Sequence, residues 1–382
     1  MKPLSVYLHV PFCAKKCDYC DFASFPGREA DWGRYFDEIR AEARYWSGET
    51  DFGWLSEKYR ISTVFVGGGT PTLVDAADLV GMIDACRGLA PFEADAEITV
   101  EGNPGTLTPR KLAAYRRAGV NRLSLGAQSF DDGLLKSLGR IHTAAQIEAA
   151  VAMARDAGFD NLNLDLMYAL PGQGMAQWQD TLDAAIGLGV EHISAYSLIV
   201  EEGTPMAARV ASGAATVPDD DAVNAMQREA VSRLGAAGYA RYEISNYARP
   251  GRECRHNLTY WRRGDYLGLG CAAHSLLEGR RFRNPDVLED YLSGLRRLDE
   301  AVLTRQDVQE ETLMLSTRTT RGLDLAAWAR DFNAPFNQGR EERLARLEAG
   351  GLIEVEGGFL RLTERGLEVQ DAVVLELMGE TE

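Results

Sequence analysis

Three cysteines lie close together near the start of the chain. Cys13, Cys17 and Cys20 have the spacing C-x3-C-x2-C, so one short loop can bring three thiolates together. Three thiolates can hold a cubane iron–sulfur cluster, whereas full ligation of a [4Fe–4S] cluster by protein takes four. One iron then stays open. An open iron can chelate the amino and carboxylate groups of S-adenosylmethionine, and an electron delivered there can cleave the sulfonium to a 5′-deoxyadenosyl radical.

A structural zinc is the alternative use of this loop, with His9 or another residue as the fourth ligand. Zinc sites usually combine one close cysteine pair with a second, distant pair, and Cys254 and Cys271 do not form such a pair. Cys86 lies in a helical pattern and is expected to be a small core residue. We expect the same structural role for Cys254 and Cys271, so the spacing favours the cluster.

A glycine run, VGGGTP, occupies residues 66–71. Gly68 and Gly69 expose backbone groups without side chains, which suits contact with the polar end of a ligand, and Thr70 follows them. The run is not a Walker loop, because no Gly-Lys-Ser/Thr sequence follows it. Taken alone it would usually be a strand-to-helix turn, so its meaning depends on the elements around it.

Between residues 4 and about 200 the chain repeats a short apolar run, a loop and a helical pattern. Helices are predicted over 144–157 and 220–236 from apolar residues spaced three or four apart. Parallel strands need such crossover helices, so we expect an α/β fold that forms a partial (β/α)6 barrel. The six predicted strands are 5–10, 61–66, 97–100, 122–126, 161–165 and 192–198.

Polar or glycine residues follow all six predicted strands. The cysteine loop follows the first strand and the glycine run follows the second. The side chains at the other four ends are Glu101, Gln128, Asp165, and the pair Glu201 and Glu202. Any one of these could simply mark where a loop begins. Their recurrence predicts an active site at the carboxyl-terminal face of the barrel.

We divide the chain into a barrel (1–240), a connecting region (241–300) and a C-terminal unit (301–382). The last unit is predicted to contain helices over 308–317, 324–332 and 339–349, then a hairpin of 352–356 with 359–363 and a final helix. This order resembles a winged helix. Residues 301–382 carry nine arginines, no lysine and 16 acidic residues, a net charge of −7. They lack the basic footprint of a DNA-binding unit, so we interpret them as a packing or lid domain.

The composition excludes several classes of protein. A net charge of −16 over 382 residues argues against binding to nucleic acid or to anionic membrane surfaces. The first residues lack the pattern of a secretory signal peptide, and no apolar run approaches the ~18 residues of a spanning helix. Six cysteines are too few for a disulfide-stapled scaffold. We therefore expect a protein of the reducing cytoplasm with no integral membrane segment.

Several motifs together resemble the radical-SAM family of oxygen-independent coproporphyrinogen III oxidases, and within it the heme-chaperone branch. The similarity covers essentially the whole chain and includes YLHVPFCAKKCDYCDF (7–22), VGGGTPT (66–72), GNPG (102–105), LGAQSF (125–130), LGRIHT (138–143), LDLMYALPGQ (164–173) and HNLTYW (256–261). The resemblance implies that Cys13, Cys17 and Cys20 ligate a [4Fe–4S] cluster. It also implies S-adenosylmethionine contacts at Tyr7, Tyr19, Gly68, Gly69, Thr70, Glu101, Gln128, Arg140 and Asp165.

The chemistry of these residues agrees with the implied contacts. The carboxylates of Glu101 and Asp165 can accept hydrogen bonds from ribose hydroxyls or an ammonium group. Arg140 can pair with a carboxylate through two parallel hydrogen bonds. An ordinary surface ion pair is the alternative for Arg140.

Two departures separate this chain from the oxidases of that family. The oxidases continue their motif to a further cysteine, C-x3-C-x2-C-x-C, where this chain has Phe22, and they carry an extension ahead of the cluster where only twelve residues precede Cys13 here. Decarboxylation of two propionates requires close control of the substrate's position. The departures therefore argue against oxidase activity.

The segment HNLTYW is the feature associated with the chaperone branch. His256 offers an imidazole to a heme iron, and Tyr260 and Trp261 offer flat apolar surface. Nearby arginines could bind propionates, namely Arg252, Arg255, Arg262 and Arg263. His274 is a second candidate ligand, and His142 and His192 are weaker ones. The alternative is that this segment packs the barrel against the C-terminal unit.

We therefore expect a cytoplasmic heme chaperone that carries a [4Fe–4S] cluster and S-adenosylmethionine and delivers heme to apo-hemoproteins. The competing hypothesis is an oxidase that converts coproporphyrinogen III to protoporphyrinogen IX. A third is an acidic winged-helix regulator with the cluster as a sensor, which the charge of the C-terminal unit disfavours. A reductant protein is an expected partner, and association of two chains through the cluster region stays open.

Overall fold

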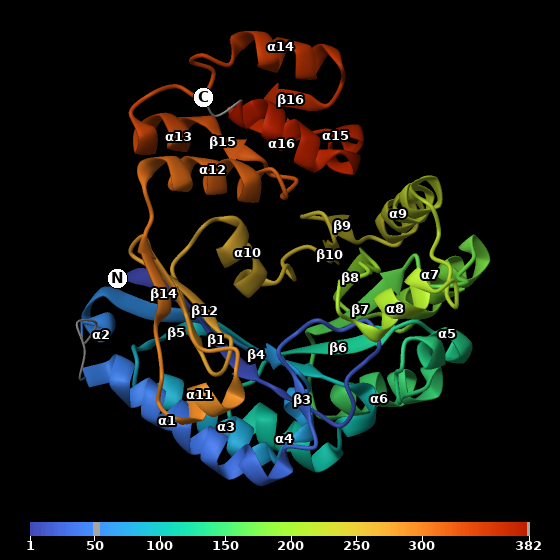
Figure 1. The fold of residues 1–382 in the computed structure, drawn as a ribbon, viewed down its shortest axis with the longest axis vertical. Helices are drawn as coiled ribbons and strands as arrows, with labels where there is room; N and C mark the ends of the chain where they lie inside the picture. The colour runs from blue at the N-terminus through green and yellow to red at the C-terminus, as the bar shows by residue number, and fades with distance from the viewer. Residues whose placement is uncertain (49–53, 380–382) are drawn as a thin grey trace.

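The computed structural model describes residues 1–48 and 54–379, and its largest element is a twelve-stranded sheet with helices along its outer face (Figure 1). Six strands at its centre run parallel in the order β1-β4-β5-β6-β7-β8. Their bounds are β1 (Lys2–Val10), β4 (Tyr59–Gly68), β5 (Phe92–Gly102), β6 (Arg122–Gln128), β7 (Leu162–Tyr168) and β8 (His192–Ser197). All six predicted strands are present, and the expected partial (β/α)6 barrel is confirmed.

Side chains alternate along β1, so one face of the sheet is apolar and the other carries polar groups. Leu4, Val6, Leu8 and Val10 are fully buried in the hydrophobic core of the barrel. The residues between them carry polar groups, and Ser5 bonds to Thr63 and Thr259 inside the barrel. Because side chains alternate with a period of two, one strand supplies both the core and the polar interior that forms the site.

Helices connect the parallel strands and cover the convex face of the sheet (Figure 1). The predicted helices over 144–157 and 220–236 are present as α6 and α9, and Asp219 caps α9 by accepting from Ala222 N at 2.9 Å. The helices between β1 and β10 are α1 (Trp32–Gly48), α2 (Leu55–Lys58), α3 (Ala76–Cys86), α4 (Pro109–Arg117), α5 (Asp132–Ser137), α6 (Ala144–Asp156), α7 (Met175–Gly187), α8 (Pro205–Ala211) and α9 (Asp220–Ala236).

Residues 240–302 extend the sheet at both edges. β9 (Ala240–Arg241) and β10 (Asn246–Ala248) pair antiparallel beyond β8. At the other edge β11 (Tyr266–Leu269) runs parallel to β1, and three antiparallel strands follow it: β12 (His274–Leu277), β13 (Arg280–Arg283) and β14 (Leu298–Val302). Helix α10 (Arg255–Trp261) lies on the concave side of the sheet, and α11 (Leu288–Leu292) lies beside α1 (Figure 1).

The C-terminal unit has its own hydrophobic core and lies at one end of the molecule (Figure 1). Its order of helices and strands is that of a winged helix, as predicted. The predicted elements are joined by a two-residue strand, β15, too short to give a sequence pattern. Their bounds are α12 (Arg305–Ser316), β15 (Leu323–Asp324), α13 (Leu325–Phe332), α14 (Glu341–Ala349), β16 (Ile353–Glu356), β17 (Phe359–Leu362), α15 (Glu364–Glu368) and α16 (Gln370–Met378).

Ion pairs join the C-terminal unit to the connecting region. Glu311 of α12 pairs with Arg263, just after α10, and with Arg281 of β13, at 2.8 and 2.7 Å.

Within residues 1–48 and 54–379, none of the helices combines the length and apolar character that crossing a bilayer requires.

Candidate functional site

A cavity of about 500 Å³ opens at the carboxyl-terminal ends of the parallel strands. All three clustered cysteines line it, and so do the glycine run and the polar side chains that follow β5, β6 and β7. Of the residues implied as cofactor contacts, those lining this cavity are Tyr19, Gly68, Gly69, Thr70, Glu101, Gln128, Arg140 and Asp165. Glu201 lines it as well, whereas Glu202 is exposed and outside the lining. Segments far apart in sequence thus form one site.

The cysteine loop is tied to the barrel by its own backbone. It starts at β2 (Phe12–Cys13), which pairs with β3 (Phe25–Pro26). In the middle of the loop, the Asp18 N–H donates to the Leu138 carbonyl at 3.2 Å, and the Asp18 carbonyl accepts from Met206 N at 2.8 Å. These contacts fix the loop between the segments that follow β6 and β8, so the thiols face the cavity.

Each thiol has a distinct environment. Cys13 Sγ lies 3.5 Å from Thr70 Oγ1, and Arg140 donates to Cys17 Sγ at 3.6 Å. Burial raises the pKa of Cys13 and of Cys20, so these thiols need a bound cation to become thiolates near neutral pH. The Arg140 guanidinium also places a hydrogen-bond donor beside Cys17. The donor set therefore fits an iron–sulfur cluster.

A single-ion site is not formed here. Among residues 1–48 and 54–379 there is no group of three His, Cys, Asp or Glu side chains that could hold one metal ion. The ligands of a cluster bind separate irons and lie farther apart than ligands of one ion. His9, the candidate fourth zinc ligand, has both ring nitrogens engaged, with Tyr7 Oη at 3.0 Å and the Ala23 carbonyl at 2.9 Å.

The glycine run forms a tight cradle beside the cysteine loop. Gly68 has φ +112°, a backbone conformation that favours glycine, and a Cβ at this position would lie 2.5 Å from the His9 ring. A Cβ at Gly69 would lie 2.7 Å from the Phe12 carbonyl oxygen. Gly69 N donates to Val10 O, and Thr70 N donates to Phe12 O, both at 2.8 Å. The cradle therefore needs glycine and is bonded to the strand that carries the cluster loop.

Two partly buried carboxyl groups line the cavity together with the cradle. Asp165 accepts from Asn163 Nδ2 at 2.8 Å and from Ser124 Oγ at 3.2 Å, and burial raises its pKa. Glu101 accepts from Gly68 N at 3.1 Å. Burial, and next the charge of Asp165, raise the pKa of Glu101 to about 8. Glu101 is thus mainly protonated at neutral pH until a cationic or hydrogen-bonding ligand arrives.

This raised pKa predicts a pH-dependent effect of Glu101→Gln on stability. Between the ordinary value of 4.5 and about 8, the folded chain binds more protons at Glu101 than the unfolded chain, so this group lowers stability as pH rises through that window. Glutamine removes the ionisation. We expect the reconstituted variant to gain stability over the parent between pH 6 and 9, by about 2–4 kcal/mol at the upper end. Anaerobic thermal unfolding measures this.

The control is Glu354→Gln at an exposed position on β16, which removes one carboxylate far from the cavity. A difference between Glu101→Gln and the parent that stays constant from pH 6 to 9 contradicts the assigned titration.

The wall opposite the cysteines is formed by β6 and β8. Gln128 has φ +68°, an uncommon conformation for a residue with a side chain, at the end of β6. Its amide oxygen accepts from Tyr196 Oη at 3.1 Å, and Arg140 donates to the Gly126 carbonyl at 2.7 Å. Tyr196 and Ser124 line the cavity but were not predicted. Ser124 lies four residues before Gln128, so the period of two could have indicated it, whereas Glu201 lies five residues after Tyr196 and gives no such signal.

Among the implied S-adenosylmethionine contacts, Tyr7 alone does not line the cavity. It lines a second pocket of about 190 Å³, together with His256 and Tyr260, and this pocket shares Glu101, Ser124 and Asp165 with the cavity. Its hydroxyl bonds to His9, which in turn bonds to the cysteine loop at Ala23. Tyr7 therefore helps to hold the cysteine loop in place through its hydrogen bond to His9.

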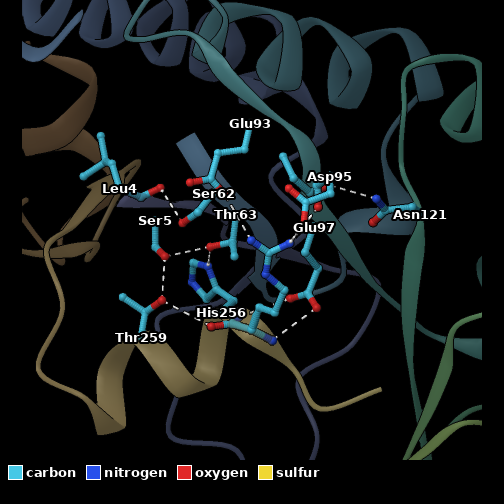
Figure 2. Close-up of polar contacts among 12 residues, drawn as sticks. Leu4, Ser5, Ser62, Thr63, Glu93, Asp95, Glu97, Asn121, His256 and Thr259 are labelled. Carbon is cyan, nitrogen blue, oxygen red and sulfur yellow. Dashed lines mark hydrogen bonds and ion pairs between the residues drawn. The ribbon is translucent and has the colours of Figure 1, made fainter. Parts of the chain in front are cut away.

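His256 lies inside the barrel and is only 1% exposed (Figure 2). Its Nδ1 lies 2.7 Å from Thr63 Oγ1, and its Nε2 lies 2.8 Å from Tyr260 Oη. Thr63 donates to Ser5 at 2.7 Å, which extends the network to β1. Both imidazole nitrogens are thus engaged. Ligation of a heme iron by His256 stays a prediction, and it would require one of these bonds to break.

Helix α10, which carries His256, packs against strands β1, β4 and β5 inside the barrel. Glu97 of β5 accepts from the backbone N–H of Arg255 and of His256 at 3.1 and 3.2 Å, which caps the start of α10 (Figure 2). At the other end of α10, the Arg318 guanidinium lies over the Trp261 ring at 4.8 Å. These contacts agree with the alternative that HNLTYW packs the barrel against the C-terminal unit.

The arginines proposed for propionate binding mostly have acidic partners. Arg252 pairs with Asp160 at 3.2 Å, Arg263 pairs with Glu311, and Arg255 pairs with Asp95 at 3.1 Å. Burial, and next the charge of Arg321, lower the pKa of Arg262. Little of this basic segment is free to bind a ligand in this conformation.

The remaining candidate residues are buried inside the protein, except for His274. His142 and His192 are buried and bonded within the barrel, while His274 is exposed on β12. The cysteines outside the loop are buried free thiols, as expected: Cys86, Cys254 and Cys271.

Comparison with known proteins agrees with this geometry. The Radical SAM superfamily model matches residues 7–185, and the HemN C-terminal domain model matches residues 303–369. The structure of coproporphyrinogen III oxidase HemN from Escherichia coli superposes with a TM-score of 0.84 and 24% identity, covering 98% of this chain and 90% of that one. That likeness establishes the fold, a radical SAM barrel with a HemN-type C-terminal unit.

Sequence relatives narrow the assignment. The chain is 38% identical to "Heme chaperone HemW" of Mycobacterium tuberculosis over 99% of this chain and 95% of that protein. It is 33% identical to the Bacillus subtilis protein of the same name, over 98% and 99%, and 41% identical to that of Escherichia coli, over 72% and 70%. The chain belongs to the HemW family of the radical SAM superfamily. Membership of that superfamily implies a [4Fe–4S] cluster and S-adenosylmethionine.

Proposed function

We propose that this protein is a heme chaperone that binds heme and delivers it to apo-hemoproteins. The supporting observation is the 38% identity, over nearly the whole length of both chains, to a protein named for that activity. The alternative, oxidation of coproporphyrinogen III, is supported by a likeness in fold at 24% identity. The family relationship favours the chaperone.

We propose that Cys13, Cys17 and Cys20 hold the cluster, since all three line the cavity. When bound, the cluster would supply an open iron and an electron. The chain's own contribution is to position a ligand. The glycine cradle offers backbone groups, Arg140 offers a guanidinium and Glu101 a carboxyl group. The S-adenosylmethionine contacts proposed here are Tyr19, Gly68, Gly69, Thr70, Glu101, Gln128, Arg140 and Asp165, with Tyr7 acting through His9.

We also propose a reducing cytoplasmic setting, because three free thiols must persist beside the cavity. The proposed units remain 1–240, 241–300 and 301–382. A reductant protein would supply electrons to the cluster. Whether two chains associate can be tested by measuring mass in solution with and without the cluster.

The test compares chaperone and oxidase activities in one preparation. Anaerobically reconstituted protein is loaded with iron protoporphyrin IX and mixed with a heme-free hemoprotein, and Soret absorbance follows the transfer. The same protein is incubated with coproporphyrinogen III, S-adenosylmethionine and a reductant. We expect heme transfer and no turnover of the porphyrinogen. Catalytic formation of protoporphyrinogen IX with no heme transfer would reverse the assignment.

A further inference from the structure

Three large apolar side chains surround the mouth of the cluster cavity. Phe22, Ile141 and Ile199 are 61%, 58% and 67% exposed, and all three line the cavity. They come from three separate loops, namely the cysteine loop and the segments that follow β6 and β8. Exposed large apolar residues that gather around one opening mark a ligand surface more strongly than scattered ones. We call these three residues the apolar rim.

Two lysines accompany the apolar rim. Lys15 and Lys16 lie on the cysteine loop, are exposed and line the same cavity. Lys16 Nζ donates to the Phe22 carbonyl at 3.0 Å, while Lys15 has no hydrogen-bond or ion-pair partner among residues 1–48 and 54–379. Asp21 and Glu201 also line the cavity and would repel a carboxylate. A ligand that combines an apolar body with carboxylates would be attracted by the ammonium groups of Lys15 and Lys16.

The sizes of the two internal spaces restrict where a macrocycle can lie. A cavity of about 500 Å³ is in the range of one drug-sized ligand, which suits S-adenosylmethionine in the cradle. The deeper pocket beside His256 measures only about 190 Å³. With the cradle occupied, the apolar rim is the surface beside the cavity that offers a macrocycle exposed apolar side chains.

We propose that heme docks on the apolar rim formed by Phe22, Ile141 and Ile199, with a propionate on Lys15, and without ligation by His256. This inference rests on the proposed function and assigns it a site. It places the macrocycle over the mouth of the cluster cavity, where it covers side chains that are otherwise in water. It also gives Phe22 a role at the position where the oxidases have a further cysteine.

The experiment is an anaerobic titration of reconstituted protein with iron protoporphyrin IX, followed by Soret absorbance, with S-adenosylmethionine present. We expect the triple variant Phe22→Ser, Ile141→Ser, Ile199→Ser to bind at least about tenfold more weakly than the parent, because apolar contact is lost. Lys15→Glu should also weaken binding. Two variants should bind as the parent does: His256→Ala, and Leu375→Ser, which alters a side chain 67% exposed in the C-terminal unit.

The outcomes separate the site from the function. If the parent binds no heme, the proposed function fails. If the parent binds heme and the triple variant binds equally well, the site is wrong while the function stands. Loss of heme binding in His256→Ala with an unchanged cluster content would move the site to α10. Iron and sulfide analysis of every variant shows whether the cluster loop has kept its structure.

Discussion

Replacing Cys17 with alanine is expected to reduce the iron and acid-labile sulfide bound after anaerobic reconstitution to less than about a tenth of the parent's content. Cys17 lies between the other two thiols in the loop and is the one that Arg140 contacts, at 3.6 Å. Two remaining cysteines cannot provide the three bonds that hold a cluster with one open iron. The characteristic visible absorbance of the cluster should disappear with the iron.

Cys86→Ala provides the matched control for this loss. Cys86 is also a free cysteine but is buried in α3, and its Sγ donates to the Met82 carbonyl at 3.4 Å. This variant should retain the parent's iron and sulfide and lose only about 1 kcal/mol of stability. Zinc in place of iron in the parent, or parental iron content in Cys17→Ala, would refute the cluster assignment.

The second large effect is expected for Gly68→Ala. A Cβ at this position lies 2.5 Å from the His9 ring, and its backbone has φ +112°, so alanine must displace both the ring and the strand end. His9 holds the cysteine loop through Ala23, and Gly68 N bonds to Glu101. One methyl group therefore disturbs the cradle, the carboxyl group and the loop together. We expect S-adenosylmethionine affinity to fall by about 100-fold in anaerobic calorimetry.

Gly158→Ala is the control for backbone strain alone. Gly158 has φ +86°, but a Cβ there meets nothing within 4 Å. It should cost about 1 kcal/mol of stability and leave the affinity unchanged. Equal affinity losses in the two variants would mean that strain, rather than the cradle, accounts for the effect. Parental affinity in Gly68→Ala would remove the cradle from the binding site.

The barrel could be predicted because its signals are local. A short apolar run followed by a helical pattern repeats six times, and each strand needs a crossover to its parallel neighbour. The two edges of the sheet could not be predicted in this way. Strands such as β12 and β13 have four residues each, and pairing with a strand far away in the sequence stabilises β11. Such pairing leaves no periodic pattern within the segment.

The candidate site could be predicted where residue type restricts the chemistry. Few roles suit three closely spaced cysteines or a run of three glycines after a strand, so these residues could be selected from the sequence alone. Tyr196 and Ser124 were missed, because tyrosine and serine occur in many surroundings. Their position in the cavity depends on the inward face of β8 and β6.

His256 shows the limit of reasoning from residue type. An imidazole beside aromatic residues and arginines suggests a heme ligand, yet α10 lies against the lower end of the barrel, and Thr63 and Tyr260 occupy both nitrogens. The partner threonine is 193 residues away in the sequence. No local pattern reports a contact of that range, because the fold of the whole sheet creates it.

The sequence by itself determined the α/β barrel, the acidic C-terminal unit and the loop that carries three thiols. Those features follow from side-chain period, net charge and the chemistry of individual residues. Tertiary structure decided which side chains share a cavity, which histidine nitrogens have partners, and that the exposed side chains of Phe22, Ile141 and Ile199 line the same cavity. These are contacts between distant segments, and their geometry is set by packing of the strands and helices rather than by any one of them.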